Sequence, residues 1–422
     1  MSAQIVSSMV EPLRTDLEIG GNQTGFCDVV VAGAVCLDVI PLFGQRAWDA
    51  DALFVPGRIV EIGPAAVATG GPVSNTGQGL HRLGMRVCLQ GKIGNDLFGQ
   101  ALLRYLAAEG LDKGLIILPE ESTSYTLVVS PPGVDRIFFH CRGANDTFGA
   151  GDVRYEMLEG ARIFHLGYPP LMHNLYSNGG EQMATIFARA KERGVTTSLD
   201  MSMPDPGSPS GKVDWVAILE RTLPHVDYFL PSAEEILFML HRDRFDALSA
   251  AAKGRDLLDF IGADLLSAMA GQLLAMGTAA VGIKCGHRGF YLRTADQERL
   301  ARCGHGAPAD IRNWAARELW EPSFHVKVAS AVGAGDAAIA GFLSALLRGY
   351  SIEQTLKIAC AVGACSVEVL DAVGGVRSWE ETINRINNGW AKNPLEVAEP
   401  GWRYDSQQQT WHGPVDMPAQ SW

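Results

Sequence analysis

Short apolar runs alternate along most of the chain with longer stretches in which apolar residues recur at helical spacing. The run 28–37 (DVVVAGAVCL) is rich in β-branched residues without polar alternation, which is typical of a strand buried on both faces. Equivalent patterns predict strands over 86–92, 162–166, 195–200, 228–230, 279–284, 289–293 and 324–328, helices over 73–83, 98–109, 181–192, 213–221, 233–240, 246–276, 336–348 and 353–369, and a long loop over 295–323. Strands that alternate with helices predict an α/β fold with a mostly parallel sheet covered on both faces.

Two stretches, about 38–70 and 115–142, depart from this alternation and carry β-like patterning instead. We expect them to form one small sheet that acts as a lid beside the main sheet. Both chain ends are polar and aperiodic, which predicts a flexible arm over 1–26 and a tail over 396–422. One globular domain is therefore predicted over 27–395.

Composition narrows the classes of function. Of 422 residues, 47% are hydrophobic and 19% charged, which suits a globular protein with a large core. The formal net charge is −12 and no run of Lys or Arg interrupts it, so neither nucleic acid nor a membrane is an expected partner. No apolar stretch approaches the ~18 residues of a membrane span. The eight cysteines form no Cys-x-x-Cys pair, so we expect reduced thiols and a cytoplasmic location.

The segment Val332-Gly333-Ala334-Gly335-Asp336 lies between a predicted strand and a predicted helix of small residues. Two glycines allow the backbone to turn sharply and approach a ligand, and the free N–H groups of a first helical turn favour an anion. A carboxylate at this point can accept a proton from an alcohol while those amides stabilise charge on a phosphoryl group. The segment therefore predicts an anion hole with a general base.

Two other interpretations arise from the same residues. Asp336 could be a simple helix N-cap. The pattern Gly333-x-Gly335-x-x-Ala338 also fits a dinucleotide-binding fingerprint. That fingerprint needs an acidic residue at a strand end ~20 positions further on, and here a second helical pattern follows instead, so we set it aside.

A second copy of these letters occurs earlier in the chain, in residues 146–152 (DTFGAGD). It follows a β-patterned stretch, and only a short polar turn over 153–159 comes after it. Because no buried helix of small residues follows to hold the loop, we assign the base to Asp336 and not to Asp152.

With these motifs in hand, the chain from about 28 to 390 resembles the ribokinase-like (PfkB) carbohydrate kinase family. The first family signature is matched by residues 70–75 (GGPVSN), continuing through Leu83-Gly84 to residues 91–99 (GKIGNDLFG). The second is matched by Gly333–Asp336, with Gly341-Phe342 after it. The resemblance implies a ribokinase-like three-layer α/β sandwich, with a mostly parallel central sheet and a small β-sheet lid.

The resemblance also implies roles for particular residues. Asp336 would be the general base, and the amides of Gly333, Ala334 and Gly335 the anion hole. The sugar would be bound by Asp38, Gly70, Gly71 and Asn75. The nucleotide would be bound by Ser232 and by the loop that contains Lys284, Gly286 and Gly289, with Glu235 assisting magnesium. Taken singly, each of these residues could instead have an ordinary structural role, such as a turn glycine, an Asp at a strand end, an Asn at a helix start or part of a plain hairpin.

Four departures from the family pattern involve five positions. Ser330 and Ala331 stand where Asp-Thr is usual, which removes an expected ligand and puts activation by a monovalent cation in doubt. Ser232 replaces the Asn of an Asn-x-x-Glu motif whose Glu235 remains. Cys36 and Gly167 replace an Asn and a Glu of ribokinases proper, which argues against ribose as the substrate.

The sequence thus predicts ATP- and Mg²⁺-dependent phosphorylation of a hydroxyl on a sugar or sugar-like alcohol. A catalytically weak sugar or nucleotide sensor of the same fold is one alternative, and a nucleoside kinase is another. The expected partners are the sugar and the nucleotide. A homodimer joined through the exposed strand edges of the lid is a further possibility.

Overall fold

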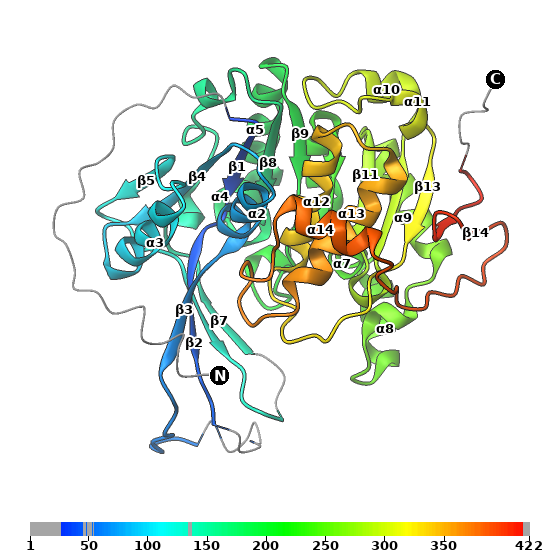
Figure 1. Cartoon of the computed structure of the whole chain (residues 1–422). Coiled ribbons are helices and arrows are strands. Elements are labelled where there is room, and N and C mark those ends of the chain that lie inside the picture. Colours follow the sequence, from blue (N-terminus) through cyan, green and yellow to red (C-terminus); the bar gives the residue numbers. More distant parts are fainter. Residues whose placement is uncertain (1–26, 45–47, 49–52, 54, 134–136, 417–422) are drawn as a thin grey trace.

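The computed structural model describes residues 27–44, 48, 53, 55–133 and 137–416; the predicted N-terminal arm lies outside these residues. The main sheet has eleven strands in the order β14-β15-β13-β12-β11-β10-β9-β8-β1-β4-β5 (Figure 1). From β5 to β11 neighbouring strands run parallel, and from β11 to β14 they run antiparallel. The strands are β1 (Val29–Gly33), β4 (Val87–Gly94), β5 (Leu115–Leu118), β8 (Ile163–Gly167), β9 (Thr196–Leu199), β10 (Tyr228–Phe229), β11 (Ala280–Lys284), β12 (Phe290–Thr294), β13 (Glu318–Glu321), β14 (Arg403–Asp405) and β15 (Thr410–His412).

Helices cover both faces of this sheet. One face carries α2 (Gly71–Arg82), α3 (Leu97–Ala108), α12 (Ala334–Leu347), α13 (Ile352–Ser366) and α14 (Trp379–Asn387). The other carries α5 (Glu181–Glu192), α6 (Trp215–Thr222), α7 (Ala233–Leu240), α8 (Arg242–Ala252) and α9 (Ala263–Ala275), and the shorter helices are α4 (His173–Tyr176), α10 (Gln297–Ala301) and α11 (Ile311–Trp314). In β1, Val29 and Val31 enter one apolar core while Val30 and Ala32 enter the other. This two-sided burial explains the unbroken apolar run in the sequence.

The predicted lid is present as a separate four-stranded sheet in the order β3-β2-β6-β7, which projects below the main body in Figure 1. Its strands are β2 (Cys36–Pro41), β3 (Ala65–Gly70), β6 (Tyr125–Val129) and β7 (Ile137–Cys141). Two details differ from the sequence prediction. The run 28–37 is divided between β1 and β2, and the first part of the predicted lid stretch 115–142 forms β5, which pairs with β4 at the edge of the main sheet.

The C-terminal third differs more from the prediction. The predicted loop 295–323 contains α10, α11 and β13, and the predicted tail contains β14 and β15, which extend the main sheet. The predicted strand 324–328 is absent, except for an isolated bridge at Phe324. The polar residues that suggested a tail have partners inside the fold: Arg317 pairs with Asp416 at 2.7 Å, and both side chains are buried. The predicted long helix 246–276 is divided into α8 and α9.

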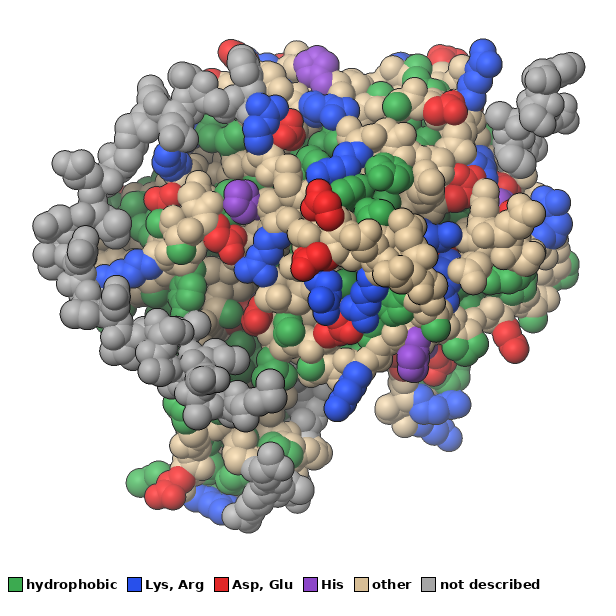
Figure 2. Space-filling model, viewed as in Figure 1, with side chains coloured by type: hydrophobic (Ala, Val, Ile, Leu, Met, Phe, Trp, Pro, Cys, Tyr) green, Lys and Arg blue, Asp and Glu red, His purple; other side chains and the backbone are tan. Residues whose placement is uncertain are grey.

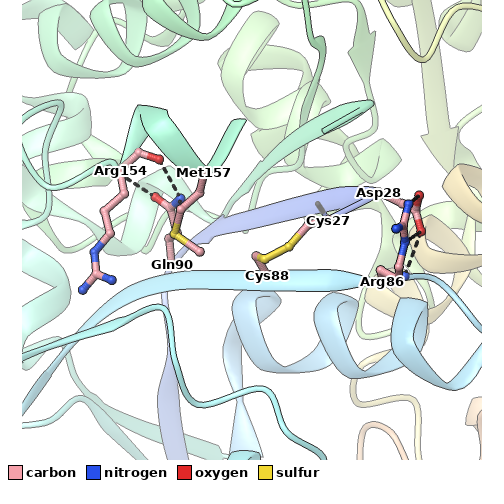
Figure 3. The surroundings of a disulfide bond; sticks show 7 residues. All are labelled: Cys27, Asp28, Arg86, Cys88, Gln90, Arg154 and Met157. Carbon is pink, nitrogen blue, oxygen red and sulfur yellow. Dashed lines mark hydrogen bonds and ion pairs between the residues drawn. A yellow bond between two sulfur atoms is a disulfide. The ribbon is translucent and has the colours of Figure 1, made fainter. Parts of the chain in front are cut away.

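One cysteine pair also differs from the expectation of reduced thiols. Cys27 and Cys88 form a disulfide with their Cα atoms 5.9 Å apart, and Figure 3 shows it between β1 and β4, near the ion pair of Asp28 with Arg86. The prediction was wrong for this pair because two cysteines 61 positions apart become neighbours only when these adjacent strands align. The other six cysteines are free thiols.

On the face seen in Figure 2, basic and acidic side chains are interspersed, and no large area of one sign is visible. Within the described part of the chain, none of the helices has both the length and the apolar character that crossing a membrane requires.

Candidate active site

Asp336 lies in the first turn of α12, three residues after the glycine that caps the helix. Gly333 is the N-cap, in the left-handed conformation (φ 72°, ψ 2°), and it makes no side-chain capping bond. Asp336 is therefore not the N-cap, and that alternative does not hold. The side chain is 1% exposed and lines a cavity of about 150 Å³.

Three side chains from other elements hold the Asp336 carboxylate. Asn75 Nδ2 and the Tyr168 hydroxyl both donate to Oδ2 at 3.0 Å, and Thr76 Oγ1 donates to Oδ1 at 3.2 Å. Burial raises the pKa of Asp336 above its ordinary value, and the hydrogen bonds from Asn75, Tyr168 and Thr76 oppose that rise, together with the charge of Lys284. The three hydrogen-bond donors thus orient the Asp336 carboxylate and favour its charged form. Burial nevertheless leaves the group more basic than an ordinary aspartate.

The cavity lies between the carboxyl ends of the central strands and the lid. Its walls include the predicted residues Asp38, Gly71, Asn75, Gly333 and Asp336. Gly70 adjoins them, since a Cβ there would lie 2.5 Å from Asp38 Oδ2. Five predicted residues from three distant parts of the chain therefore meet in one space, as expected for ligand binding at the carboxyl ends of parallel strands.

Two of the cavity glycines are required by their conformation and surroundings. Gly71 has φ 79°, and a Cβ there would lie 2.6 Å from the carbonyl oxygen of Ala34. A Cβ on Gly333 would lie 2.5 Å from that of Ala372. Any larger residue would be strained at both positions, so the loop geometry depends on glycine.

A second polar cluster lies beside the start of α12. Lys284, at the end of β11, donates to Asp200 Oδ1 at 2.5 Å, and a Cβ added to Gly335 would lie 3.3 Å from the Lys284 ammonium. Asp200 Oδ2 is buried without a hydrogen-bond partner. Burial and the nearby carboxylates of Glu235 and Asp336 raise the pKa of Asp200, against the effect of Lys284. This corner of the site is therefore rich in negative charge with one ammonium group.

Ser232 and Glu235 form the capping box that begins α7. Ser232 Oγ accepts from the Glu235 amide at 3.4 Å, and Glu235 Oε2 accepts from the Ser232 amide at 2.7 Å. Among the described residues there is no group of three or more potential metal ligands. Mg²⁺ usually takes one or two carboxylates and completes its shell with phosphates and water, and the orphaned Asp200 oxygen with Glu235 fits that demand.

Gly286 and Gly289 lie farther along the same connection. They flank the 3₁₀ turn Gly286–Arg288 between β11 and β12, where the Cys285 amide donates to the Gly289 carbonyl at 2.8 Å. Neither is among the residues that line the cavity around Asp336. The structure thus brings Lys284 beside Gly335 at the start of α12 and leaves the two glycines in the turn.

The departures from the family pattern have local explanations. Ser330 Oγ accepts from the Val332 amide at 3.2 Å and so supports the loop before Gly333. A Cβ on Gly167 would lie 2.4 Å from Pro72 Cβ, which leaves no space for the Glu of ribokinases at this point.

The sequence did not single out several residues that contribute to the site. Tyr168, Thr76 and Asp200 are described above, and Asn145, Thr126 and His140 also line the cavity. Tyr168 has a left-handed backbone (φ 62°), which is uncommon for a large residue and marks a constrained position. Its place directly after a buried strand and before Pro169-Pro170 was the available signal. No sequence signal distinguished Thr126 and His140, because the lid strands carry many other polar residues.

The earlier copy of the motif has a different environment. Asp152 Oδ2 accepts from the Gly149 amide at 2.8 Å and pairs with Lys92 at 3.3 Å. Asp152 does not line the cavity that contains Asp336. Of the two aspartates, Asp336 lines this cavity and Asp152 does not, and the assignment of the base to Asp336 stays a prediction.

Comparisons with known proteins agree with this geometry. The model of the pfkB family carbohydrate kinases matches residues 29–378. The chain belongs to this family. The 2-dehydro-3-deoxygluconokinase of Bacillus subtilis is 23% identical over 336 residues, which cover 78% of this chain and 90% of that protein.

Solved structures share the fold. The fructokinase of Xylella fastidiosa with bound ATP superposes with a TM-score of 0.62 at 18% identity, covering 86% of this chain and 99% of that one. An E. coli protein in complex with ATP and Mg²⁺ gives a TM-score of 0.61 at 20% identity, covering 86% and 100%. The predictions of the family, of the ribokinase-like fold and of a carbohydrate kinase are confirmed.

Proposed function

We propose that this carbohydrate kinase transfers the γ-phosphoryl group of ATP to a hydroxyl of a sugar or sugar-like alcohol, with Asp336 as the general base. The observation that supports this most is the Asp336 carboxylate in the cavity wall, oriented by Asn75, Thr76 and Tyr168. A base held in this way can take the hydroxyl proton as the oxygen attacks phosphorus.

The anion hole is proposed to be the start of α12. The first amides of a helix have no partner within it, and the helix dipole is positive at this end. The N–H groups of Gly333, Ala334 and Gly335 would stabilise the charge that develops on the phosphoryl oxygens. Lys284, whose ammonium lies beside Gly335, would neutralise part of the same charge.

Mg²⁺ would bridge the phosphates and neutralise charge when it is bound. Asp200 and Glu235 are the residues proposed to hold it, in part through water. The nucleotide itself would lie against Ser232, Lys284, Gly286 and Gly289. Because Ser330 and Ala331 replace the usual cation-binding pair, we propose no role for a monovalent cation.

The test is release of ADP in the presence of ATP, Mg²⁺ and a panel of sugars, polyols and nucleosides. Release with at least one acceptor, abolished in Asp336→Asn, is the expected result. Binding of ATP or sugar without turnover for any acceptor would instead support the sensor. The nucleoside alternative has one observation in its favour, since Phe138 lines the mouth of the cavity, whereas Tyr125 packs against Phe98 with ring centroids 5.0 Å apart.

Two further points stay proposals. The lid leaves the edge strands β3 and β7 and the half-exposed Phe138 available to a second copy, which supports a homodimer. The proposed compartment is the cytoplasm; the six free thiols support it, and the disulfide of Cys27 with Cys88 opposes it.

A further inference from the structure

Among the described residues that line the acceptor cavity, the charged side chains are all of one sign. Its described lining includes two carboxylates, Asp38 and Asp336, and no Lys or Arg. Both carboxylates are buried, at 9% and 1% exposure. A negatively charged group on the acceptor would be enclosed with them without a counterion, and unpaired buried charges of like sign are strongly unfavourable.

Two described cations whose charges act on residues of the cavity wall, Lys284 and Arg142, have other partners. Lys284, whose charge acts on Asp336, is engaged by Asp200 on the side proposed for phosphate. Arg142 donates to the Tyr176 hydroxyl at 2.8 Å and lies 3.8 Å from Asp146. Neither lines the cavity, so neither is available to an anionic acceptor.

Two residues that line the same space carry buried polar atoms without partners. Asn75 Oδ1 and His140 Nε2 are buried with no hydrogen-bond partner, and both residues line the cavity. Leaving a buried polar atom unsatisfied is unfavourable, so each such atom is a site where a ligand hydroxyl would be favoured. These atoms can bond to neutral hydroxyl groups without any change in charge.

His140 is linked to Asp38 along the inner face of the lid. His140 Nδ1 lies 3.1 Å from Thr126 Oγ1, which lies 3.7 Å from Cys36 Sγ. Cys36 Sγ in turn donates to Asp38 Oδ1 at 3.5 Å. Burial lowers the pKa of His140, and the charge of Arg142 lowers it further, which keeps the imidazole neutral. The ring is thus held at Nδ1, and Nε2 remains without a hydrogen-bond partner in a residue that lines the cavity.

We propose that the acceptor is an uncharged polyhydroxyl compound, a neutral sugar or polyol rather than a sugar acid or a sugar phosphate, and that His140 Nε2 recognises one of its hydroxyls. This inference rests on the proposed function. Phe138, two residues before His140 on β7, lines the same cavity and supplies an apolar surface for the C–H face of such a compound.

The first experiment uses the unaltered chain. kcat/KM is measured with ATP and Mg²⁺ for D-glucose, D-fructose and D-ribose, other neutral sugars and polyols, the corresponding aldonic acids such as D-gluconate, and the phosphate monoesters. The best neutral acceptor is expected to exceed its acid and its phosphate by at least about 100-fold, the scale of an unpaired buried charge. A preferred acid or phosphate would overturn the inference. If that turnover still depended on Asp336, the proposed function would survive.

The second experiment tests His140 with the best neutral acceptor and its monodeoxy analogues. His140→Ala is expected to raise KM by about 10-fold or more with kcat little changed, and His140→Gln to recover part of the loss. One deoxy analogue should be turned over equally by the original chain and by His140→Ala, which identifies the hydroxyl. If every analogue loses the same factor on substitution, the role of His140 is merely structural. If His140→Ala fails to fold, the kinetics of His140→Gln still test the role of His140. The comparison of neutral, acidic and phosphorylated acceptors still tests the charge of the acceptor.

Discussion

Residues 146–152 and 330–336 both end in Gly-Ala-Gly-Asp, yet they form different structures. In the later segment the glycine starts a 14-residue helix whose buried side chains anchor the loop, and Asp336 faces the cavity. The earlier segment is followed by a 3₁₀ turn, Tyr155–Leu158, and its aspartate is used to close the loop on the Gly149 amide. The comparison shows that the structure adopted by the Gly-Ala-Gly-Asp motif depends on the buried helix that follows it and on the hydrogen-bond donors that surround its aspartate.

The largest effect is expected for Asp336→Asn. The substitution keeps the size of the side chain but removes the base, so kcat should fall by about 10²–10⁴-fold while the acceptor Kd changes little. Steady-state kinetics and calorimetric sugar binding measure the two quantities. A loss of less than about threefold in kcat would remove Asp336 from the mechanism.

The next effect concerns the glycines of the two loops. Gly333→Ala adds a Cβ 2.5 Å from Ala372 Cβ at a residue with φ 72°, so we expect a loss of stability of about 1–3 kcal/mol and impaired turnover. Gly151→Ala, a control change in the earlier loop, meets no atom within 4 Å and should leave both nearly unaltered. Thermal unfolding and ADP release are the measurements. Equal sensitivity of the two positions would contradict the distinction between the loops.

Tyr168→Phe tests the donors around Asp336. The hydroxyl bond lowers the pKa of Asp336, so its removal should raise that pKa and shift the acidic limb of the kcat profile to higher pH. We expect a loss of kcat of about 10-fold at neutral pH, the scale of one hydrogen bond to a charged group. An unshifted limb would mean that Tyr168 acts only in packing.

The pH profile of kcat/KM should also report Asp38. Burial raises its pKa to about 6, so ionised Asp38, which would accept bonds from the sugar, is lost as pH falls below that value. Activity should therefore decline on the acidic side near pH 6, and Asp38→Asn should remove this limb along with tight sugar binding. Folding stability should depend on pH in the opposite direction to activity. Because the pKa of Asp38 is raised in the folded state, its contribution to stability is present at low pH and is lost as pH rises through about 6.

The smallest effect is expected for Asp152→Asn. The ion pair with Lys92 is partly exposed on the Asp152 side, and such pairs contribute little, about 1 kcal/mol or less. Turnover should stay within about twofold of the original chain, as measured under the same conditions as for Asp336→Asn. A loss comparable with that of Asp336→Asn would reverse the assignment of the two copies.

Features that depend on residues close together in the chain could be predicted from the sequence, and features that depend on distant residues could not. The sequence predicted the alternation of strands and helices and the lid, and it singled out Asp336. Each of these rests on a pattern of residues that are close together in the chain. The disulfide of Cys27 and Cys88 and the strands β13, β14 and β15 were missed. Each of them depends on partners far away in the chain, such as Asp416 for Arg317.

The sequence by itself determined the kinase family and most of the alternating strands and helices, and it singled out the proposed base, since local periodicity and two short signatures carry this information. Only the tertiary structure decided what surrounds that base. Asn75 and Tyr168 reach Asp336 from 261 and 168 positions away, and His140 enters the cavity from the lid. Such contacts arise when distant strands end at the same edge of a sheet, and no local propensity specifies which side chains then face one another.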